Sequence, residues 1–129
     1  QCESFYSVDK WDGDRGHNAR EYMRTLNRLR KFGSRSIVMR LEFSEALPLF
    51  SDEFFDFIYI DGYAHDGQNN GETIHAWWPK VKSGGCFAGH DYDAQFPLVI
   101  KHVDEFAASH NLELKFTTEK CPSWFLFKP

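Results

Sequence analysis

The strongest constraint on the fold is one apolar run near the middle of the chain. Residues 54–60 read FFDFIYI, with a single charged residue, and the run ends at Asp61 followed by Gly62. A strand of a parallel sheet has this nearly continuous apolar pattern when both of its faces are buried. The run therefore predicts an α/β protein in which residues 54–60 form a strand covered on both sides.

Strand-like runs alternate with helical patterns along the rest of the chain. Helices are predicted over residues 17–32, 44–49, 74–81 and from 97, and further strands over residues 3–8, 36–41, 86–89, 112–116 and 124–127. Ser44 is expected to cap its helix, and Gly84 and Gly85 are expected to turn the chain into the next strand. This alternation predicts a mostly parallel sheet with flanking helices and an antiparallel C-terminal strand pair, in one domain over residues 1–129.

Net charge, hydrophobicity and cysteine content indicate which kinds of binding partner are not expected to be the main ones. The formal net charge of -4 argues against nucleic acid as the main partner. No apolar run approaches the ~20 residues of a membrane span, so no membrane partner is expected. Cys2, Cys86 and Cys121 lack CxxC spacing, which predicts neither a disulfide framework nor a cysteine zinc motif. The expected location is therefore the reducing cytoplasm.

Acidic and imidazole side chains follow several of the predicted strands. Asp9 ends the first strand, Asp61 follows the run at 54–60, and His90 and Asp91 follow the strand at 86–89, while His65 lies in the loop after Asp61. Ligands of open α/β sheets bind beyond the carboxyl ends of the strands. We therefore expect a shared site for a divalent cation such as Mg²⁺, Mn²⁺ or Zn²⁺. The alternative is that these residues only form turns and caps.

The segment that contains Asp61, His65, His90 and Asp91 resembles part of a known protein family. Residues 56–92, FDFIYIDGYAHDGQNNGETIHAWWPKVKSGGCFAGHDY, resemble the second half of class I S-adenosylmethionine-dependent methyltransferases, most closely the small-molecule O-methyltransferase-like branch. SVDKW at residues 7–11 looks like the second strand of that family. The resemblance runs from about Tyr6 to Trp124. It implies a Rossmann-like class I methyltransferase fold.

The same resemblance implies the cofactor S-adenosylmethionine and residues that bind it. Asp9 matches the acid that holds the ribose hydroxyls in the family. Phe43 and Ser44 fall where the family contacts the adenine, and Asp61 is included with them as a cofactor-binding residue. These four residues are the predicted cofactor-binding set.

Catalytic and metal-binding roles are also implied by the resemblance. Asp61 and Asp91 fall where metal-dependent members bind a divalent ion, and His90 replaces the first acid of their DDy motif. The implied reaction is O-methylation of a small-molecule acceptor, which must lose a proton. His65 is the preferred base and His90 the second choice, with Asp91 beside them and a cation lowering the acceptor's pKa.

One feature of the family is missing from this sequence. Its opening strand and glycine-rich turn, which approach the methionine end of the cofactor, have no counterpart before the strand at residues 3–8. Three explanations stay open: the sequence is a fragment, the strands ending at Asp9 and Asp61 pair directly, or a partner chain in a homodimer completes or covers the reduced sheet. The alternative to an enzyme is an inactive remnant of the fold that acts as a binding or oligomerisation module.

Overall fold

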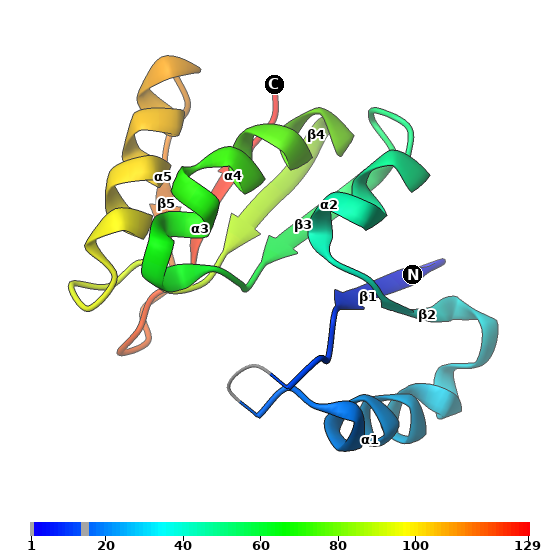
Figure 1. Cartoon of the computed structure of the whole chain (residues 1–129). Helices are drawn as coiled ribbons and strands as arrows, with labels where there is room; N and C mark the ends of the chain where they lie inside the picture. The colour runs from blue at the N-terminus through cyan, green and yellow to red at the C-terminus, as the bar shows by residue number, and fades with distance from the viewer. Residues whose placement is uncertain (1, 14–15) are drawn as a thin grey trace. The chain divides into compact units, whose positions relative to one another are not determined.

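The computed structural model describes residues 2–13 and 16–129. The chain divides into two compact units, Gln1–Leu49 and Phe50–Pro129, which are described separately. Figure 1 shows strands alternating with helices in both units. The expectation of a single domain over residues 1–129 stays a prediction. No helix among the described residues is long and apolar enough to cross a membrane.

In the first unit, two parallel strands are joined through a helix. Strand β1 (Phe5–Asp9) pairs in parallel with β2 (Ser36–Arg40), as the alternation predicted. Helix α1 (Ala19–Leu29) begins after Asn18, whose side chain accepts hydrogen bonds from two backbone N–H groups of the first turn. A 3₁₀ segment, η1 (Arg30–Arg35), then connects the helix to β2.

The short helix after β2 begins differently from the prediction. Helix α2 (Phe43–Ala46) starts after Glu42 and continues into η2 (Leu47–Leu49). The side chains of Glu42 and Glu45 form a capping box, each accepting from the other's backbone N–H. The expectation that Ser44 caps this helix is therefore wrong, because Ser44 already lies inside the first turn.

The second unit contains a mixed sheet in the order β3-β4-β6-β5. Strands β3 (Phe55–Ile60) and β4 (Val81–Gly89) are parallel, and β6 (Trp124–Phe127) runs antiparallel to both β4 and β5 (Lys115–Phe116). The antiparallel C-terminal pair is thus confirmed. In the described part of the chain, β1 and β2 form a separate two-stranded sheet, so direct pairing of the strands that end at Asp9 and Asp61 is not observed.

The connections of the second unit are helical and form its core with the sheet. They are η3 (Ala64–Asp66), α3 (Gly67–Asn70), α4 (Glu72–Trp77), η4 (Trp78–Lys80) and α5 (Pro97–Ser109). The backbone of α3 is left-handed, and a Cβ at Gly67 would lie only 2.6 Å from the His102 ring of α5. Most buried apolar residues of the unit come from these helices and from β4 and β6: Ile74, Val81, Phe87, Val99, Val103, Phe106, Trp124 and Leu126.

Two expectations about this sheet are wrong. Residues 54–60 were expected to be covered on both faces, but Phe57 and Tyr59 are 51% and 42% exposed. Side chains alternate along a strand, so Phe57 and Tyr59 lie on the same face of β3, and their exposure shows that this face is not covered as expected. Gly84 and Gly85 do not precede β4 but lie within it, at an irregularity in its register with β3.

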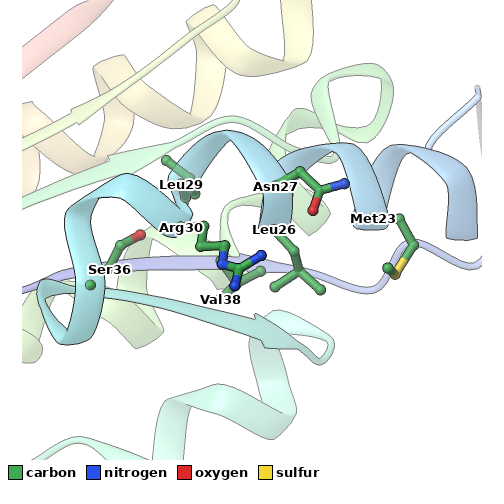
Figure 2. A pocket seen from close by; sticks show the side chains of 8 residues that line it. Met23, Leu26, Asn27, Leu29, Arg30, Ser36 and Val38 are labelled. Atoms are coloured by element: carbon green, nitrogen blue, oxygen red, sulfur yellow. The ribbon is translucent and has the colours of Figure 1, made fainter.

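A surface cavity of about 340 Å³ lies in the first unit, between α1 and β2 (Figure 2). Its apolar lining includes Met23, Leu26 and Val38. None of the site residues predicted from the sequence lines it. The cavity therefore does not coincide with the predicted binding residues.

Candidate functional site

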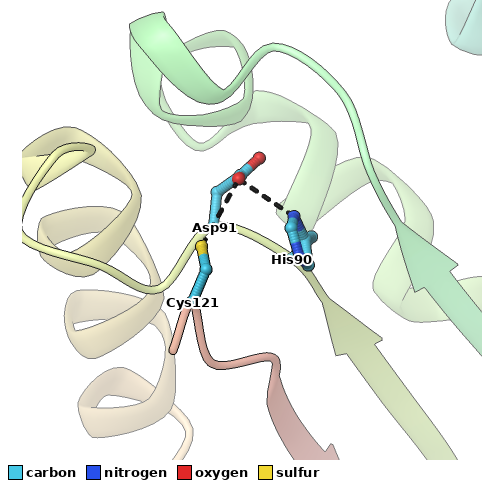
Figure 3. A group of neighbouring side chains, drawn as sticks. All are labelled: His90, Asp91 and Cys121. Atoms are coloured by element: carbon cyan, nitrogen blue, oxygen red, sulfur yellow. Dashed lines mark hydrogen bonds and ion pairs between the residues drawn. The ribbon is translucent and has the colours of Figure 1, made fainter. Parts of the chain in front are cut away.

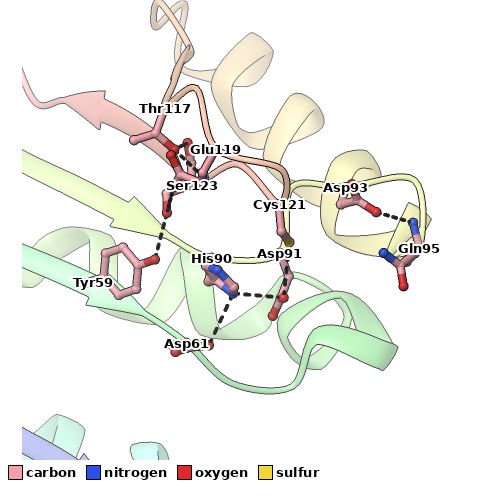
Figure 4. Close-up of polar contacts among 10 residues, drawn as sticks. All are labelled: Tyr59, Asp61, His90, Asp91, Asp93, Gln95, Thr117, Glu119, Cys121 and Ser123. Carbon is pink, nitrogen blue, oxygen red and sulfur yellow. Dashed lines mark hydrogen bonds and ion pairs between the residues drawn. The ribbon is translucent and has the colours of Figure 1, made fainter.

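The ends of β3 and β4 bring three of the predicted residues together. Ile60 and Gly89 are partners in the parallel register, and the His90 N–H donates to the Ile60 carbonyl at 2.9 Å. Asp61 and His90 therefore leave the sheet side by side. The Nδ1 atom of His90 lies 3.8 Å from Asp61 Oδ1 and 2.9 Å from Asp91 Oδ1, as Figure 4 shows.

Local packing fixes the positions of His90 and Asp91. A Cβ at Gly89 would lie 2.5 Å from the ring of Trp124, so the strand needs glycine immediately before His90. Asp91 has a positive φ of 63°, a conformation that costs a non-glycine residue free energy and often occurs at functional sites. The side chain of Asp91 is 15% exposed, against 65% for Asp61. Asp91 is thus the sheltered carboxylate of the pair.

Cys121 is a further member of this site, which the sequence analysis did not single out. Its Sγ atom lies 3.9 Å from Asp91 Oδ1 (Figure 3), and the donor atoms of His90, Asp91 and Cys121 all lie within 4.8 Å of one another. Burial and the negative charges of Asp91 and Asp93 raise the pKa of the Cys121 thiol. No local sequence pattern indicates this contact, because it depends on β6 starting beside the end of β4.

A second set of side-chain hydrogen bonds lies at the same edge of the sheet. The Tyr59 hydroxyl lies 2.8 Å from Ser123 Oγ, which donates to Glu119 at 3.4 Å. Burial raises the pKa of the Tyr59 phenol, and the negative charge of Asp61 acts in the same direction, while the hydrogen bond with Ser123 opposes both. These contacts hold the segment before β6 against the end of β3.

His65 does not join this group. It lies in η3, and its ring packs edge-on against Phe96 with ring centroids 5.3 Å apart. Within the described residues no hydrogen bond or ion pair links it to Asp61, His90 or Asp91. Its role as a base therefore stays a prediction.

The remaining predicted residues belong to the first unit. The Asp9 carboxylate accepts a hydrogen bond from the Trp11 N–H at 2.8 Å and lies 2.9 Å from His17 Nδ1. Phe43 and Ser44 open α2, which follows the end of β2 beside β1. Asp9 and the start of α2 thus follow neighbouring strand ends, and their part in cofactor binding stays a prediction.

The donor atoms around His90 suit a divalent cation that accepts nitrogen and sulfur ligands. Magnesium prefers oxygen ligands in octahedral geometry, whereas imidazole and thiolate favour zinc and similar ions. The residues present therefore fit a cation, although the imidazole and the nearby thiol make magnesium a poor match. A cation held here would polarise an acceptor hydroxyl and favour loss of its proton.

Comparison with known proteins places the chain in a family. A family model described as "Methyltransferase domain" matches residues 1–92, more than half of the sequence. The chain therefore belongs to this methyltransferase domain family. No curated protein sequence matches the chain significantly.

Solved structures show the same fold at low sequence identity. A protein from Corynebacterium glutamicum is 13% identical over 97% of this chain and 60% of its own, with a TM-score of 0.72. The O-methyltransferase NovP is 17% identical over 98% of this chain and 60% of its own, with a TM-score of 0.71. An rRNA methylase from Streptococcus thermophilus is 14% identical over 97% of this chain and 73% of its own, with a TM-score of 0.70.

These matches define the fold class. The chain has a truncated α/β fold of the class I methyltransferase type and spans about 60% of the length of the first two structures. An O-methyltransferase and an rRNA methylase both share it. The fold therefore does not by itself identify the methyl acceptor.

Proposed function

We propose that this chain forms part of an S-adenosylmethionine-dependent methyltransferase that methylates an oxygen atom of a small molecule. The observation that carries the proposal is the meeting of Asp61, His90 and Asp91 at neighbouring strand ends in a chain that belongs to a methyltransferase domain family. Oxygen is proposed as the acceptor atom because a hydroxyl group beside His90 and the two carboxylates could lose its proton there, and the O-methyltransferase NovP is one of the structures that share the fold. The net charge of -4 favours a small molecule over nucleic acid.

Cofactor binding is assigned to Asp9, Phe43 and Ser44 of the first unit and, in the second unit, to Asp61. Asp9 would hold the ribose hydroxyls, and Phe43 and Ser44 would contact the adenine. Bound S-adenosylmethionine supplies an electrophilic methyl group. Because both oxygens of the Asp9 carboxylate already have a neighbour, Trp11 N–H and His17 Nδ1, its orientation is set before the cofactor arrives. This preorganisation lowers the entropic cost of binding.

The acceptor side is assigned to the ends of β3 and β4. The acceptor's hydroxyl group would lose its proton to an imidazole of this chain when it receives the methyl group that the bound cofactor supplies. His65 is our first choice as the base and His90 the second. A cation among Mg²⁺, Mn²⁺ and Zn²⁺, held by Asp61, His90 and Asp91, would lower the pKa of the acceptor hydroxyl.

The decisive experiment is calorimetric titration with S-adenosylmethionine, made on the natural polypeptide expressed in full. We expect saturable binding that Asp9→Asn weakens. The matched control is Asp56→Asn, because Asp56 lies within β3 rather than at its end, and its side chain is 85% exposed in an ion pair with Lys82. Absence of binding by the wild type, or equal affinity of the two variants, would contradict the proposal. Turnover assays of His65→Ala and His90→Ala then test which imidazole is the base.

A second candidate function is supported by the open face of the β3-containing sheet. Phe57, Tyr59 and Phe127 are 51%, 42% and 51% exposed, and exposed aromatic clusters are typical of interaction surfaces. On this alternative the chain is an inactive relative that binds a partner or forms a homodimer, in the cytoplasm. A stable dimer by light scattering, together with no binding of S-adenosylmethionine, would favour it over the enzyme.

A further inference from the structure

Three chemically different donor atoms meet where β4 ends and β6 begins. His90 supplies a ring nitrogen, Asp91 a carboxylate oxygen and Cys121 a thiol sulfur, and these atoms all lie within 4.8 Å of one another (Figure 3). Two of them come from adjacent residues, and the third is thirty positions further along the chain. The antiparallel pairing of β4 with β6 is what joins them, since Gly89 and Trp124 are register partners.

The spacing of these atoms suits a tetrahedral ion. Bonds of about 2.0–2.3 Å from zinc to nitrogen, oxygen and sulfur place neighbouring ligand atoms about 3.3–3.7 Å apart. The observed separations bracket this range, at 2.9 Å for His90 Nδ1 to Asp91 Oδ1 and 3.9 Å for Asp91 Oδ1 to Cys121 Sγ. The third pair, His90 and Cys121, has its donor atoms within 4.8 Å of each other, so binding of an ion would draw these side chains closer together.

The ligand types and their surroundings select the class of ion. We propose that His90, Asp91 and Cys121 form a three-ligand site for a thiolate-binding divalent cation, with Zn²⁺ as the natural occupant and Co²⁺ as a usable probe. Nitrogen, sulfur and a single carboxylate match Zn²⁺, whereas Mg²⁺ requires a mainly oxygen environment. On binding, the sulfur–metal bond replaces the S–H bond, and the thiol proton is released to solvent.

Three protein ligands leave one coordination position open. Catalytic zinc sites commonly have this arrangement, with water or substrate in the fourth position. Asp61 lies 3.8 Å from His90 Nδ1, and its side chain is 65% exposed, but it is not a member of the cluster of three donor atoms. In this arrangement Asp61 borders the open position while Cys121 replaces it as the third ligand. The use of the ion in methyl transfer rests on the proposed function, but ion binding itself does not.

Cobalt spectroscopy tests the site directly, because thiolate ligation gives Co²⁺ an intense near-ultraviolet charge-transfer band that oxygen and nitrogen ligands do not give. We expect the wild-type protein to develop this band on titration with Co²⁺ and to lose it on addition of Zn²⁺, but not of excess Mg²⁺. Cys121→Ser should abolish the band. The control is Cys86→Ser, since Cys86 is a free, half-buried cysteine in β4 outside the cluster, and this variant should keep the band.

Calorimetric titration with Zn²⁺ measures how much metal affinity the Cys121 side chain contributes. Replacing a residue that only orients a ligand typically costs about 10–100-fold in metal affinity, so loss of the ligand itself should cost about 100-fold or more in Cys121→Ser. Circular dichroism of both variants without metal checks that they are folded. A merely structural Cys121 would leave zinc affinity unchanged in a folded Cys121→Ser variant, which would overturn the proposal.

The outcomes separate this inference from the proposed function. A wild-type protein that binds S-adenosylmethionine but shows no cobalt–thiolate band refutes the metal site and leaves methyl transfer standing. A protein that shows the band, loses it in Cys121→Ser and does not bind S-adenosylmethionine supports the metal site and refutes the enzyme. A band that persists in Cys121→Ser, or that disappears equally in Cys86→Ser, refutes the ligand assignment.

Discussion

Replacing Gly89 by alanine tests how tightly the end of β4 is packed where it delivers His90. A Cβ at Gly89 would lie 2.5 Å from Cζ2 and 2.6 Å from Cε2 of Trp124. Trp124 is 0% exposed, so its ring has no open space to move into. The added methyl group must therefore displace either the strand or the indole.

The size of the effect follows from this geometry. Carbon atoms pack best at about 3.5–4.0 Å, so the alanine requires a shift of about 1 Å in a fully buried region. Overpacking of a core costs about 1–3 kcal/mol, and the smaller backbone entropy of unfolded alanine offsets about 0.4–1 kcal/mol of this. We expect Gly89→Ala to lower the free energy of unfolding by about 1–2 kcal/mol.

A double-mutant cycle read by urea unfolding, with circular dichroism as the probe, isolates the contact. Trp124→Phe removes the atoms that clash, so Gly89→Ala should cost less in that background, with a coupling energy of about 1 kcal/mol or more. Gly84→Ala is the control in the same strand. Nothing lies within 4 Å of its added Cβ, and its φ of +77° makes the cost one of backbone strain alone. Equal costs of Gly89→Ala in both backgrounds would refute the steric explanation.

Two other measurements follow from local contacts. The pKa of Tyr92 is raised to about 12, mainly by burial and then by its hydrogen bond to Asp104. The neutral phenol therefore stabilises the folded protein below the usual tyrosine pKa of 10, and this contribution is lost as the pH rises toward 12. Ultraviolet titration should therefore lose its most alkaline phenol step in Tyr92→Phe, and an unchanged curve would contradict this. Glu42→Ala should cost about 1 kcal/mol in urea unfolding by removing its side-chain hydrogen bond in the capping box with Glu45. Ser44→Ala should have little effect, and the reverse order would show that Ser44 is the cap after all.

Much of the site-bearing sheet could be predicted because its pattern is local. The apolar run before Asp61 and the glycine before His90 mark two strand ends. In a parallel sheet, neighbouring strand ends meet at one edge. This argument predicted that Asp61, His90 and Asp91 lie close together, and the His90 ring nitrogen lies 3.8 Å and 2.9 Å from the two carboxylates; the functional roles of the three residues stay predictions.

Other features depend on contacts that no local pattern encodes. Cys121 reaches the site only because β6 pairs beside β4, and neither residue spacing nor composition indicates that pairing. Phe57 and Tyr59 are as apolar as their neighbours in β3, yet both are exposed, as is Phe127 of the inner strand β6. Which faces of a sheet are covered depends on packing that the pattern of one strand does not encode. The placement of Gly84 inside β4 likewise depends on register, because its N–H donates to the Lys128 carbonyl at 2.8 Å.

Because β6 runs alongside β4, the residue that reaches the site and the residues that stabilise the sheet occupy different positions of the same segment. Position 121 lies before the buried stretch of β6 and beyond residues 1–92, which match the family model. A substitution there would change the ligands of the proposed metal site but leave the buried side chains of Trp124 and Leu126 in place. At that proposed site, the choice of ion would therefore be adjustable by one substitution in a segment that contributes little to the core.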